Sequence, residues 1–216
     1  MIHEVDGLLR SLLQGGALTG SDIEIVFDVP TSDWAARRNA PVLDCYLYDI
    51  REDVNRRQRG VAPVRDERGI TVSRRRAPRW FRLSYLLTAW TKRPEDEHRL
   101  LSAALATLIP QEVLPPDSLP EPLAALGLSL PLTVSGAQSE SRSLAEIWSS
   151  LGGTLKPSLD LVITVPFPPY PDYDAGPPVT EGALVRAREL DGPLEDDDRM
   201  HQPRHLARTD TGARTR

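Results

Sequence analysis

One stretch of the sequence, Arg79 to Trp90, constrains the fold more than any other. It reads R-W-F-R-L-S-Y-L-L-T-A-W. Every second residue from Phe81 onwards is apolar, whereas the intervening residues become apolar only towards Trp90. Because successive side chains of a β-strand point to opposite faces, this pattern predicts a strand buried on one face throughout and on both faces in its C-terminal half. We therefore expect a central strand of a sheet that helices cover.

Three other segments have the pattern of strands. Residues 22–29 alternate strictly between polar and apolar, which predicts a strand with one wet face near a sheet edge. Residues 42–50 are largely apolar on both faces and are expected to lie centrally, beside the Arg79–Trp90 strand. Residues 159–165 form the last clear strand, and residues 128–134 are a weaker candidate.

Three segments have the pattern of helices. Apolar residues recur at helical spacing from residue 5 to residue 13, before Gly15 and Gly16. A second helix is expected to begin at Pro94 and to end by Pro110. A third is expected to begin at Ser143, which forms a capping-box pattern with Glu146. The order of these elements predicts an α+β fold, a mixed sheet flanked by helices.

Length and composition limit the classes of protein that remain. The chain has 216 residues, enough for one domain with a real core, or for one domain plus a tail. Its net charge of −5 argues against a general polyanion binder. It begins M-I-H-E-V-D and contains no run of about 18 apolar residues. We therefore expect no secretory signal, no membrane-spanning helix and synthesis in the cytoplasm.

Residues 51–82 differ in charge from the rest of the chain. They contain eleven arginines and four acidic residues, a local balance of +7. The sequence D-E-R-G at residues 66–69 predicts a turn between two short strands. We expect an arginine-rich β-ribbon or loop that projects from the sheet. It could be a solvated face, contact an acidic protein surface such as another copy of the chain, or bind phosphates.

The phosphate-binding interpretation is the alternative function, a nucleic-acid-binding module that uses the basic cluster Arg51–Arg82. Only Trp80 and Phe81 could stack on bases nearby, and both lie in a predicted strand, so base stacking has little support.

The chain changes character from Pro166 onwards. Six prolines accompany Tyr170 and Tyr173, and an acidic run, Glu195 to Asp198, follows without any periodicity. We expect two parts: a domain at residues 1–166 and an extended or disordered tail at residues 167–216. The proline and tyrosine segment could dock on a neighbour as an arm, or it could be a solvated linker.

Reactive constellations are not evident in the sequence. Cys45 lies in an apolar strand pattern, which favours a small buried residue over a catalytic thiol. Asp49 and Glu52 could serve as paired acid–base carboxylates, but ion pairs at a strand end or an intersubunit contact are the simpler interpretations. Glu95 and His98 have a spacing that could hold a metal, but they also suit the first turns of a helix. We expect no catalytic, metal or cofactor site.

Three tryptophans have two possible roles, in a binding surface or in core packing. Trp34, Trp80 and Trp90 could form a binding surface, although core packing explains each of them as well.

Seven segments, taken together and in order, resemble one protein family. They are V-P-T-S-D-W-A-A-R-R-N-A-P (29–41), L-Y-D-I-R-E-D (47–53), R-D-E-R-G (65–69), L-S-Y-L-L-T-A-W-T (83–91), P-E-D-E-H-R-L-L (94–101), V-L-P-P-D-S-L-P (113–120) and L-K-P-S-L-D-L-V-I-T-V-P (155–166). They are similar to the cap or tail-terminator proteins of phage-tail-like extracellular contractile injection systems. The antifeeding prophage and the Photorhabdus virulence cassette are examples. The resemblance covers residues 1–166 and not the tail.

The resemblance implies a structural role. It implies a fold like that of phage tail terminators and a homo-hexameric ring on the distal end of the inner tube and contractile sheath. Such a ring stops elongation, stabilises the extended sheath and has no catalytic role. The implied partners are other copies of the chain, the inner tube protein and the sheath protein, without membrane or nucleic acid. The implied location is the cytoplasm, within an assembled particle that can be released.

The residue pattern, and not the resemblance, suggests which side chains meet neighbours. We expect these contacts at Trp34, Arg37, Arg38, Arg51, Glu52, Arg56, Arg57, Arg74, Arg75, Arg76, Tyr170 and Tyr173.

Overall fold

The fold was obtained as a computed structural model, which describes residues 1–168 and 173–174, apart from residues 17, 122 and 137–142. The described residues all belong to one compact unit, Met1–Pro178. Most of the predicted tail at residues 167–216 lies outside the described residues, so the two-part division of the chain stays a prediction.

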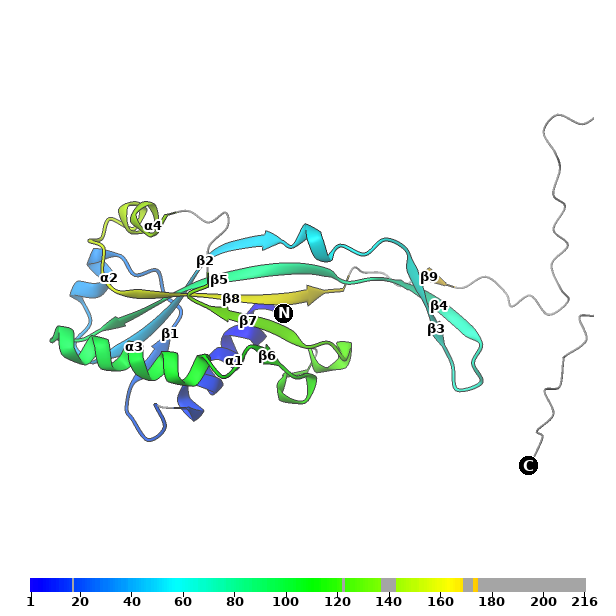
Figure 1. Cartoon of the computed structure of the whole chain (residues 1–216), viewed down its shortest axis with the longest axis horizontal. Helices are drawn as coiled ribbons and strands as arrows, with labels where there is room; N and C mark the ends of the chain where they lie inside the picture. The colour runs from blue at the N-terminus through cyan, green and yellow to red at the C-terminus, as the bar shows by residue number, and fades with distance from the viewer. Residues whose placement is uncertain (17, 122, 137–142, 169–172, 175–216) are drawn as a thin grey trace, which may run out of the picture. The chain divides into compact units, whose positions relative to one another are not determined.

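The main sheet has six strands and is mixed (Figure 1). Its strands, from one edge to the other, are β1 (Glu24–Val26), β2 (Val42–Glu52), β5 (Arg79–Trp90), β8 (Ser158–Phe167), β7 (Leu130–Val134) and β6 (Val113–Leu114). β1 pairs with β2 in parallel, and the other pairings are antiparallel. The predicted neighbourhood of β2 and β5 is confirmed by a ladder that runs from Val42 opposite Trp90 to Glu52 opposite Phe81.

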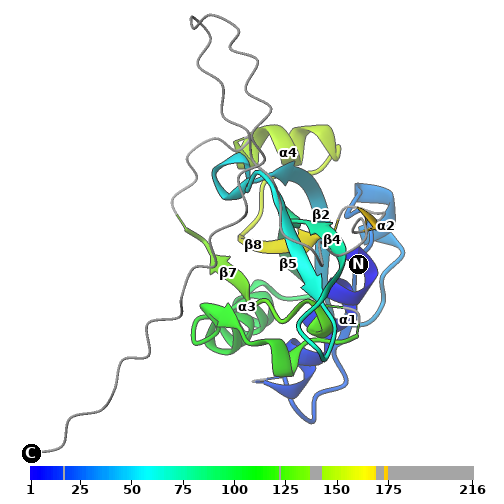
Figure 2. The ribbon, with the colours of Figure 1, turned by 90° about the vertical axis from the view of Figure 1, so that its right-hand side faces the viewer.

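Helices cover the two faces of this sheet unequally. Helices α1 (Ile2–Gly15) and α3 (Pro94–Leu108) lie on one face, and the shorter α4 (Leu144–Ser150) lies on the other (Figures 1 and 2). The main core forms under α1 and α3, where Leu9 and Leu108 meet Leu87 and Leu161. The smaller core under α4 contains Trp148 and covers only one end of the opposite face. The remainder of that face is left without a helix among the described residues.

β5 behaves as its sequence predicts. All seven residues from Leu83 to Ala89 are buried, whereas the four from Arg79 to Arg82 are exposed or partly exposed. α4 accounts for this change, because its Ile147 and Trp148 cover Leu86 on the second face. Burying each of these large side chains is worth about 1.5–3 kcal/mol. The strand is therefore central, and its C-terminal half is sandwiched between the two cores.

The predicted helix starts are also confirmed. Ser143 accepts a hydrogen bond from the backbone N–H of Glu146, and the Glu146 carboxylate accepts one from the backbone N–H of Ser143, each at 3.2 Å. This reciprocal capping box begins α4. α3 begins at Pro94 and carries acidic residues in its first turn, where they favour the positive end of the helix dipole.

The segment before β2 departs from its prediction. The strand expected at residues 22–29 is an edge strand as predicted, but it has only three residues, Glu24–Val26. It stops because the backbone N–H of Asp28 donates to the carboxylate of Asp44, at 3.1 Å, and Thr31 turns back onto Val29. A short helix that the sequence did not suggest, α2 (Ser32–Ala36), follows with Thr31 as its cap.

Three short 3₁₀ turns complete the connections. They are η1 (Val54–Arg56), η2 (Pro116–Ser118) and η3 (Ala124–Leu126).

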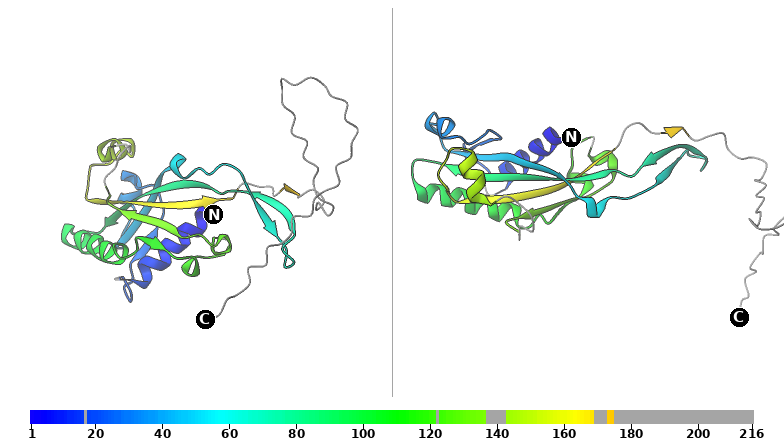
Figure 3. Two further views of the ribbon diagram at one scale, coloured as in Figure 1. Left: turned by 45° about the vertical axis from the view of Figure 1, so that its right-hand side comes forward. Right: turned by 90° about the horizontal axis from the view of Figure 1, so that it is seen from above.

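The arginine-rich segment forms part of a separate ribbon. β3 (Val61–Arg65) and β4 (Thr71–Arg76) pair as a hairpin, and β9 (Tyr173–Asp174) pairs with the other edge of β4. In the turn, the Asp66 carboxylate accepts hydrogen bonds from two backbone N–H groups, and Gly69 adopts a left-handed φ of 78°. The hairpin extends beyond the end of the main sheet at which β2 finishes and β5 begins (Figure 3).

Candidate assembly surfaces

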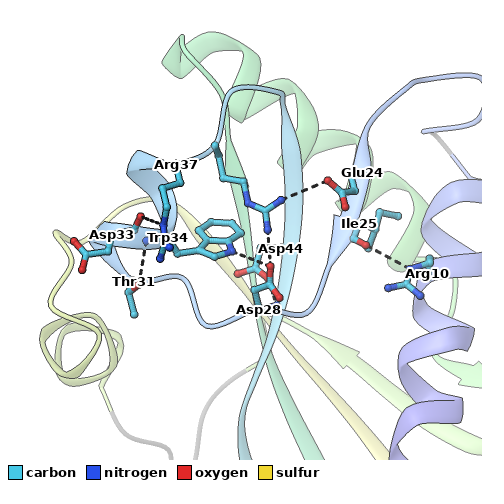
Figure 4. Close-up of polar contacts among 10 residues, drawn as sticks. Arg10, Glu24, Ile25, Asp28, Thr31, Asp33, Trp34, Arg37 and Asp44 are labelled. Atoms are coloured by element: carbon cyan, nitrogen blue, oxygen red, sulfur yellow. Dashed lines mark hydrogen bonds and ion pairs between the residues drawn. The ribbon is translucent and has the colours of Figure 1, made fainter.

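Trp34 lies in a cluster of polar contacts beside the start of β2 (Figure 4), and Arg38 joins this cluster through its bond to Asp28. The Asp28 carboxylate accepts hydrogen bonds from Trp34 Nε1 at 2.8 Å and from Arg38 at 2.5 Å. Arg38 also pairs with Glu24 at 3.5 Å, and its guanidinium lies 4.5 Å from the centre of the Trp34 ring. Both predicted contact residues therefore make internal contacts that hold the connection between β1 and β2.

Asp44 contacts this cluster through the backbone of Asp28. It is fully buried on β2, and one oxygen accepts the backbone N–H of Asp28. Burial raises the pKa of Asp44 to about 8, and the neighbouring Asp28 charge acts in the same direction. Asp44 is consequently mostly protonated at neutral pH. Sequence reasoning missed both aspartates, because neither has a motif and their meeting depends on how the chain folds back.

A row of tryptophans extends from this cluster. Trp34 meets Trp90 edge-on with 5.5 Å between ring centres, and Trp90 lies 6.3 Å from the Trp148 ring. The Lys156 ammonium is 3.8 Å from the centre of the Trp90 ring and pairs with Glu97 at 2.8 Å. These contacts support the interpretation that Trp34 and Trp90 serve packing within the chain.

A hollow of about 620 Å³ opens beside the same end of the sheet. Ile23, Trp90 and Leu100 provide apolar lining, and Lys92 and Arg93 stand among its basic residues.

Glu52 is held between two arginines at the other end of β2. Arg57 and Arg79 each donate two hydrogen bonds to its carboxylate, with their Nε atoms 2.9 and 2.8 Å from Oε1. These bonds, from Arg79 first and Arg57 second, lower the pKa of Glu52 to about 2. A carboxylate that stays ionised at neutral pH is a structural anchor and a poor general acid.

Three more of the predicted contact residues make local contacts. Arg37 is exposed and donates to a backbone carbonyl of α2 at 3.1 Å. Arg51 pairs with Asp49 at 2.7 Å. Arg56 places its guanidinium 5.2 Å from the centre of the Trp80 ring.

A polar hollow of about 440 Å³ occupies the sheet face that α4 leaves open. Arg82, Thr133 and Thr164 line it from three neighbouring strands. Tyr48, at an irregularity in the pairing of β2 with β5, donates to the Asp160 carboxylate at 2.7 Å. Among the described residues, no helix covers this polar part of the sheet face.

The ribbon carries the three predicted contact residues of β4. Arg74, Arg75 and Arg76 on β4 are all exposed. The backbone at residues 173 and 174 pairs with residues 74 and 73, so the arm at Tyr173 lies on the ribbon of its own chain. Tyr170 lies outside the described residues.

Reactive groups are few in the described part of the chain. Cys45 is fully buried, as predicted, and burial raises the pKa of its thiol. Glu95 pairs with Arg93 at 3.7 Å, and His98 is exposed. Among the described residues, no group of three histidine, cysteine, aspartate or glutamate side chains gathers as a metal site. None of the described helices has the length and hydropathy needed to span a membrane.

Comparison with known families and structures identifies the family of this chain. Residues 4–181 match the family described as the Pvc16 N-terminal domain, a match over far more than half of the chain. The chain belongs to the Pvc16 N-terminal domain family. The family resemblance predicted from the seven sequence segments is therefore confirmed. A comparison with curated proteins found no match.

Two solved structures share the fold. One is the PVC sheath/tube terminator of an extracellular contractile injection system in its extended state, with a TM-score of 0.63 and 23% identity over 88% of this chain. The other is the anti-feeding prophage cap, a tube terminating cap, with a TM-score of 0.59 and 22% identity over 84% of this chain. The predicted terminator-like α+β fold is confirmed. The aligned region covers 65% and 60% of the two relatives, so this chain corresponds to less than two thirds of their length.

Proposed function

We propose that this protein is a structural terminator of a contractile injection particle, a cap on the end of the inner tube and sheath. The observation that carries the proposal is the family match over residues 4–181, together with the shared fold of a sheath/tube terminator and a tube terminating cap. The proposed partners are the tube and sheath proteins, and the proposed location is the particle itself. The proposed role is non-enzymatic.

We further propose a homo-hexameric ring. A cap must close on itself, which requires a heterologous contact in which two different surfaces of the subunit meet. The open polar sheet face and the ribbon are two such surfaces. Six copies on one tube end would make each contact multivalent, so each single contact can be weak.

The segment of residues 51–82, which includes the β3–β4 hairpin of the ribbon, is the proposed contact of highest positive charge. Residues 51–82 carry eleven arginines against four acidic residues, although the whole chain has a net charge of −5. Charge separation of this kind within one subunit favours and orients the approach of further copies or of acidic surfaces. Arg74, Arg75 and Arg76 stand at its exposed strand, and Trp34 and Arg38 are proposed at the opposite end of β2.

The deciding experiment compares particles made with and without the gene by electron microscopy. Without the cap, we expect tubes and sheaths of irregular length, or sheaths contracted before any trigger. Restoring the gene should restore uniform, extended particles.

Uniform, extended particles in the absence of the gene would contradict the proposal. The basic cluster would then be tested for salt-dependent nucleic-acid binding, the alternative function.

A further inference from the structure

An acidic knob, residues 109–121, follows the C-terminal end of α3. It contains three acidic residues and no basic one. Two of its apolar side chains, Ile109 and Val113, are 63% and 51% exposed. Its three acidic side chains are also exposed, and none of them has an ion-pair partner among the described residues. They are Glu112, Asp117 and Glu121.

The fold holds the acidic knob in one shape. Leu114 and Leu119 are buried and attach the knob to the main core. Val113 alternates with Leu114 along β6 and therefore points away from that core. The hydroxyl of Ser118 donates to the carbonyl of Pro115 at 2.8 Å and fixes the turn that follows. A surface that is already ordered loses little conformational entropy when it binds a partner.

The hollow of about 620 Å³ beside the start of α3 has the opposite charge. Its apolar lining includes Trp90 and Leu100, and its lining contains four basic residues and one acidic residue. Trp90 is held in place, because its Nε1 donates to Thr88 at 2.8 Å and the Lys156 ammonium lies 3.8 Å from its ring centre. Lys92 is exposed, and its ammonium has no ion-pair partner among the residues that the structure describes. Such a hollow suits an apolar side chain next to a carboxylate.

The knob and the hollow lie at opposite ends of α3 (Figure 1). The hollow takes Asp96 and Leu100 from the first two turns of the helix, and the knob begins directly after Leu108, its last residue. The 15 residues of α3 span about 22 Å. The knob of one copy can therefore fill the hollow of another copy and not its own. A contact between two different surfaces is heterologous and repeats from copy to copy.

We propose that the acidic knob of one copy binds the hollow of the next copy in the full-length protein. Val113 contacts Trp90, and the Glu112 carboxylate pairs with the Lys92 ammonium. The role of this contact in a ring rests on the proposed function, whereas the contact itself stands on charge, exposure and the arrangement along α3. It leaves the ribbon and the open polar sheet face for the tube and sheath.

Cross-linking of the purified full-length protein tests the contact. A40C/V113C places one thiol at the hollow and one on the knob, whereas Cys45 is buried and does not react. A short bismaleimide should join the chains into a ladder of covalent dimers, trimers and larger species. A40C alone and V113C alone should stay monomeric, because a head-to-tail contact does not bring two identical sites together.

Charge reversal tests the ion pair on the same ladder. Added to the cysteine pair, K92E or E112K should each reduce the cross-linked fraction about tenfold. Both reversals together, K92E/E112K, should restore the ladder because the exchanged charges attract again. K92R keeps the positive charge and is the matched control that should cross-link normally.

Three results would overturn the proposal. They are the absence of a ladder from A40C/V113C, covalent dimers without larger species, and a failure of K92E/E112K to restore what the single reversals remove. Each leaves the particle assembly experiment unaffected, so a failure here is distinguishable from a failure of the proposed function.

Discussion

Asp44 shows how a single side chain couples the fold to pH. Its carboxyl is fully buried on β2, and its second oxygen has no hydrogen-bond partner among the described residues. The pKa is about 8 in the folded protein against an ordinary value of 3.8. Between these pH values the folded state binds more protons than the unfolded state. The free energy of unfolding therefore falls as pH rises from about 4 to about 8, by at most about 1.4 kcal/mol per pH unit.

The Asp44→Asn variant should remove this dependence. An asparagine Oδ1 can still accept the Asp28 N–H, and it carries no titratable charge. We expect the free energy of unfolding of the variant, relative to that of the wild type, to be higher at pH 8 than at pH 5. Urea unfolding of both proteins at the two pH values measures this difference. Asp22→Asn, at an exposed position, is the control and should change little. An equal effect of Asp44→Asn at both pH values would contradict the assignment.

At the scale of elements, the close approach of α1 and α3 depends on one glycine. A Cβ atom on Gly16 would lie 2.3 Å from Thr107 Cγ2, at the end of α1 where it meets α3. The neighbouring Gly15 has open space at the same position. The sequence pattern treats the two glycines as one helix stop, yet only the second has a packing reason to lack a side chain.

The two glycines provide a matched test. Gly16→Ala should destabilise the protein by about 1–3 kcal/mol, because the helices must separate or Thr107 must move. Gly15→Ala should be neutral or stabilising by about 0.5–1 kcal/mol, since alanine favours the helix. Urea unfolding of both variants measures the difference. If both variants lost the same free energy of unfolding, the close approach of Gly16 to Thr107 would not explain the destabilisation.

At the scale of the whole molecule, charge is distributed unevenly between residues 51–82, which include the β3–β4 hairpin, and the rest of the chain. Residues 51–82 hold +7, and the chain as a whole holds −5. Exposed arginines of this kind add little to the stability of the subunit, because solvent screens their pairs. Five of the eleven arginines lie at residues 61–76, on the β3–β4 hairpin and its turn. We propose that this concentration serves contacts between subunits or with tube and sheath.

Reversal of charge on β4 tests that explanation. R74E/R75E/R76E should leave the subunit folded and weaken ring formation or docking on the tube, as measured by mass photometry and by electron microscopy of particles. R74K/R75K/R76K keeps the positive charge at the same three positions, should assemble normally, and serves as the control. Normal rings and particles from the β4 variant would remove the ribbon from the proposed interface.

Short-range patterns in the sequence predicted most of the local elements and the family. The alternation in β5, the capping box of α4 and the proline start of α3 each express a short-range rule, because burial on a strand or helix follows a fixed period and a helix end needs partners within a few residues. The seven segments that indicated the family are likewise runs of neighbouring residues. These features need no knowledge of which distant segments meet.

Contacts between residues far apart in the sequence follow from the tertiary arrangement of the strands and helices. Asp28 meets Asp44 and Trp34 meets Trp90 because β1, α2 and β5 converge, and Glu52 meets Arg79 because β2 and β5 pair in one register. The shortness of β1 has the same origin, since a buried carboxylate takes the N–H that would otherwise continue the strand. Side chains far apart in sequence have no period that relates them, so their partners follow from topology and register alone.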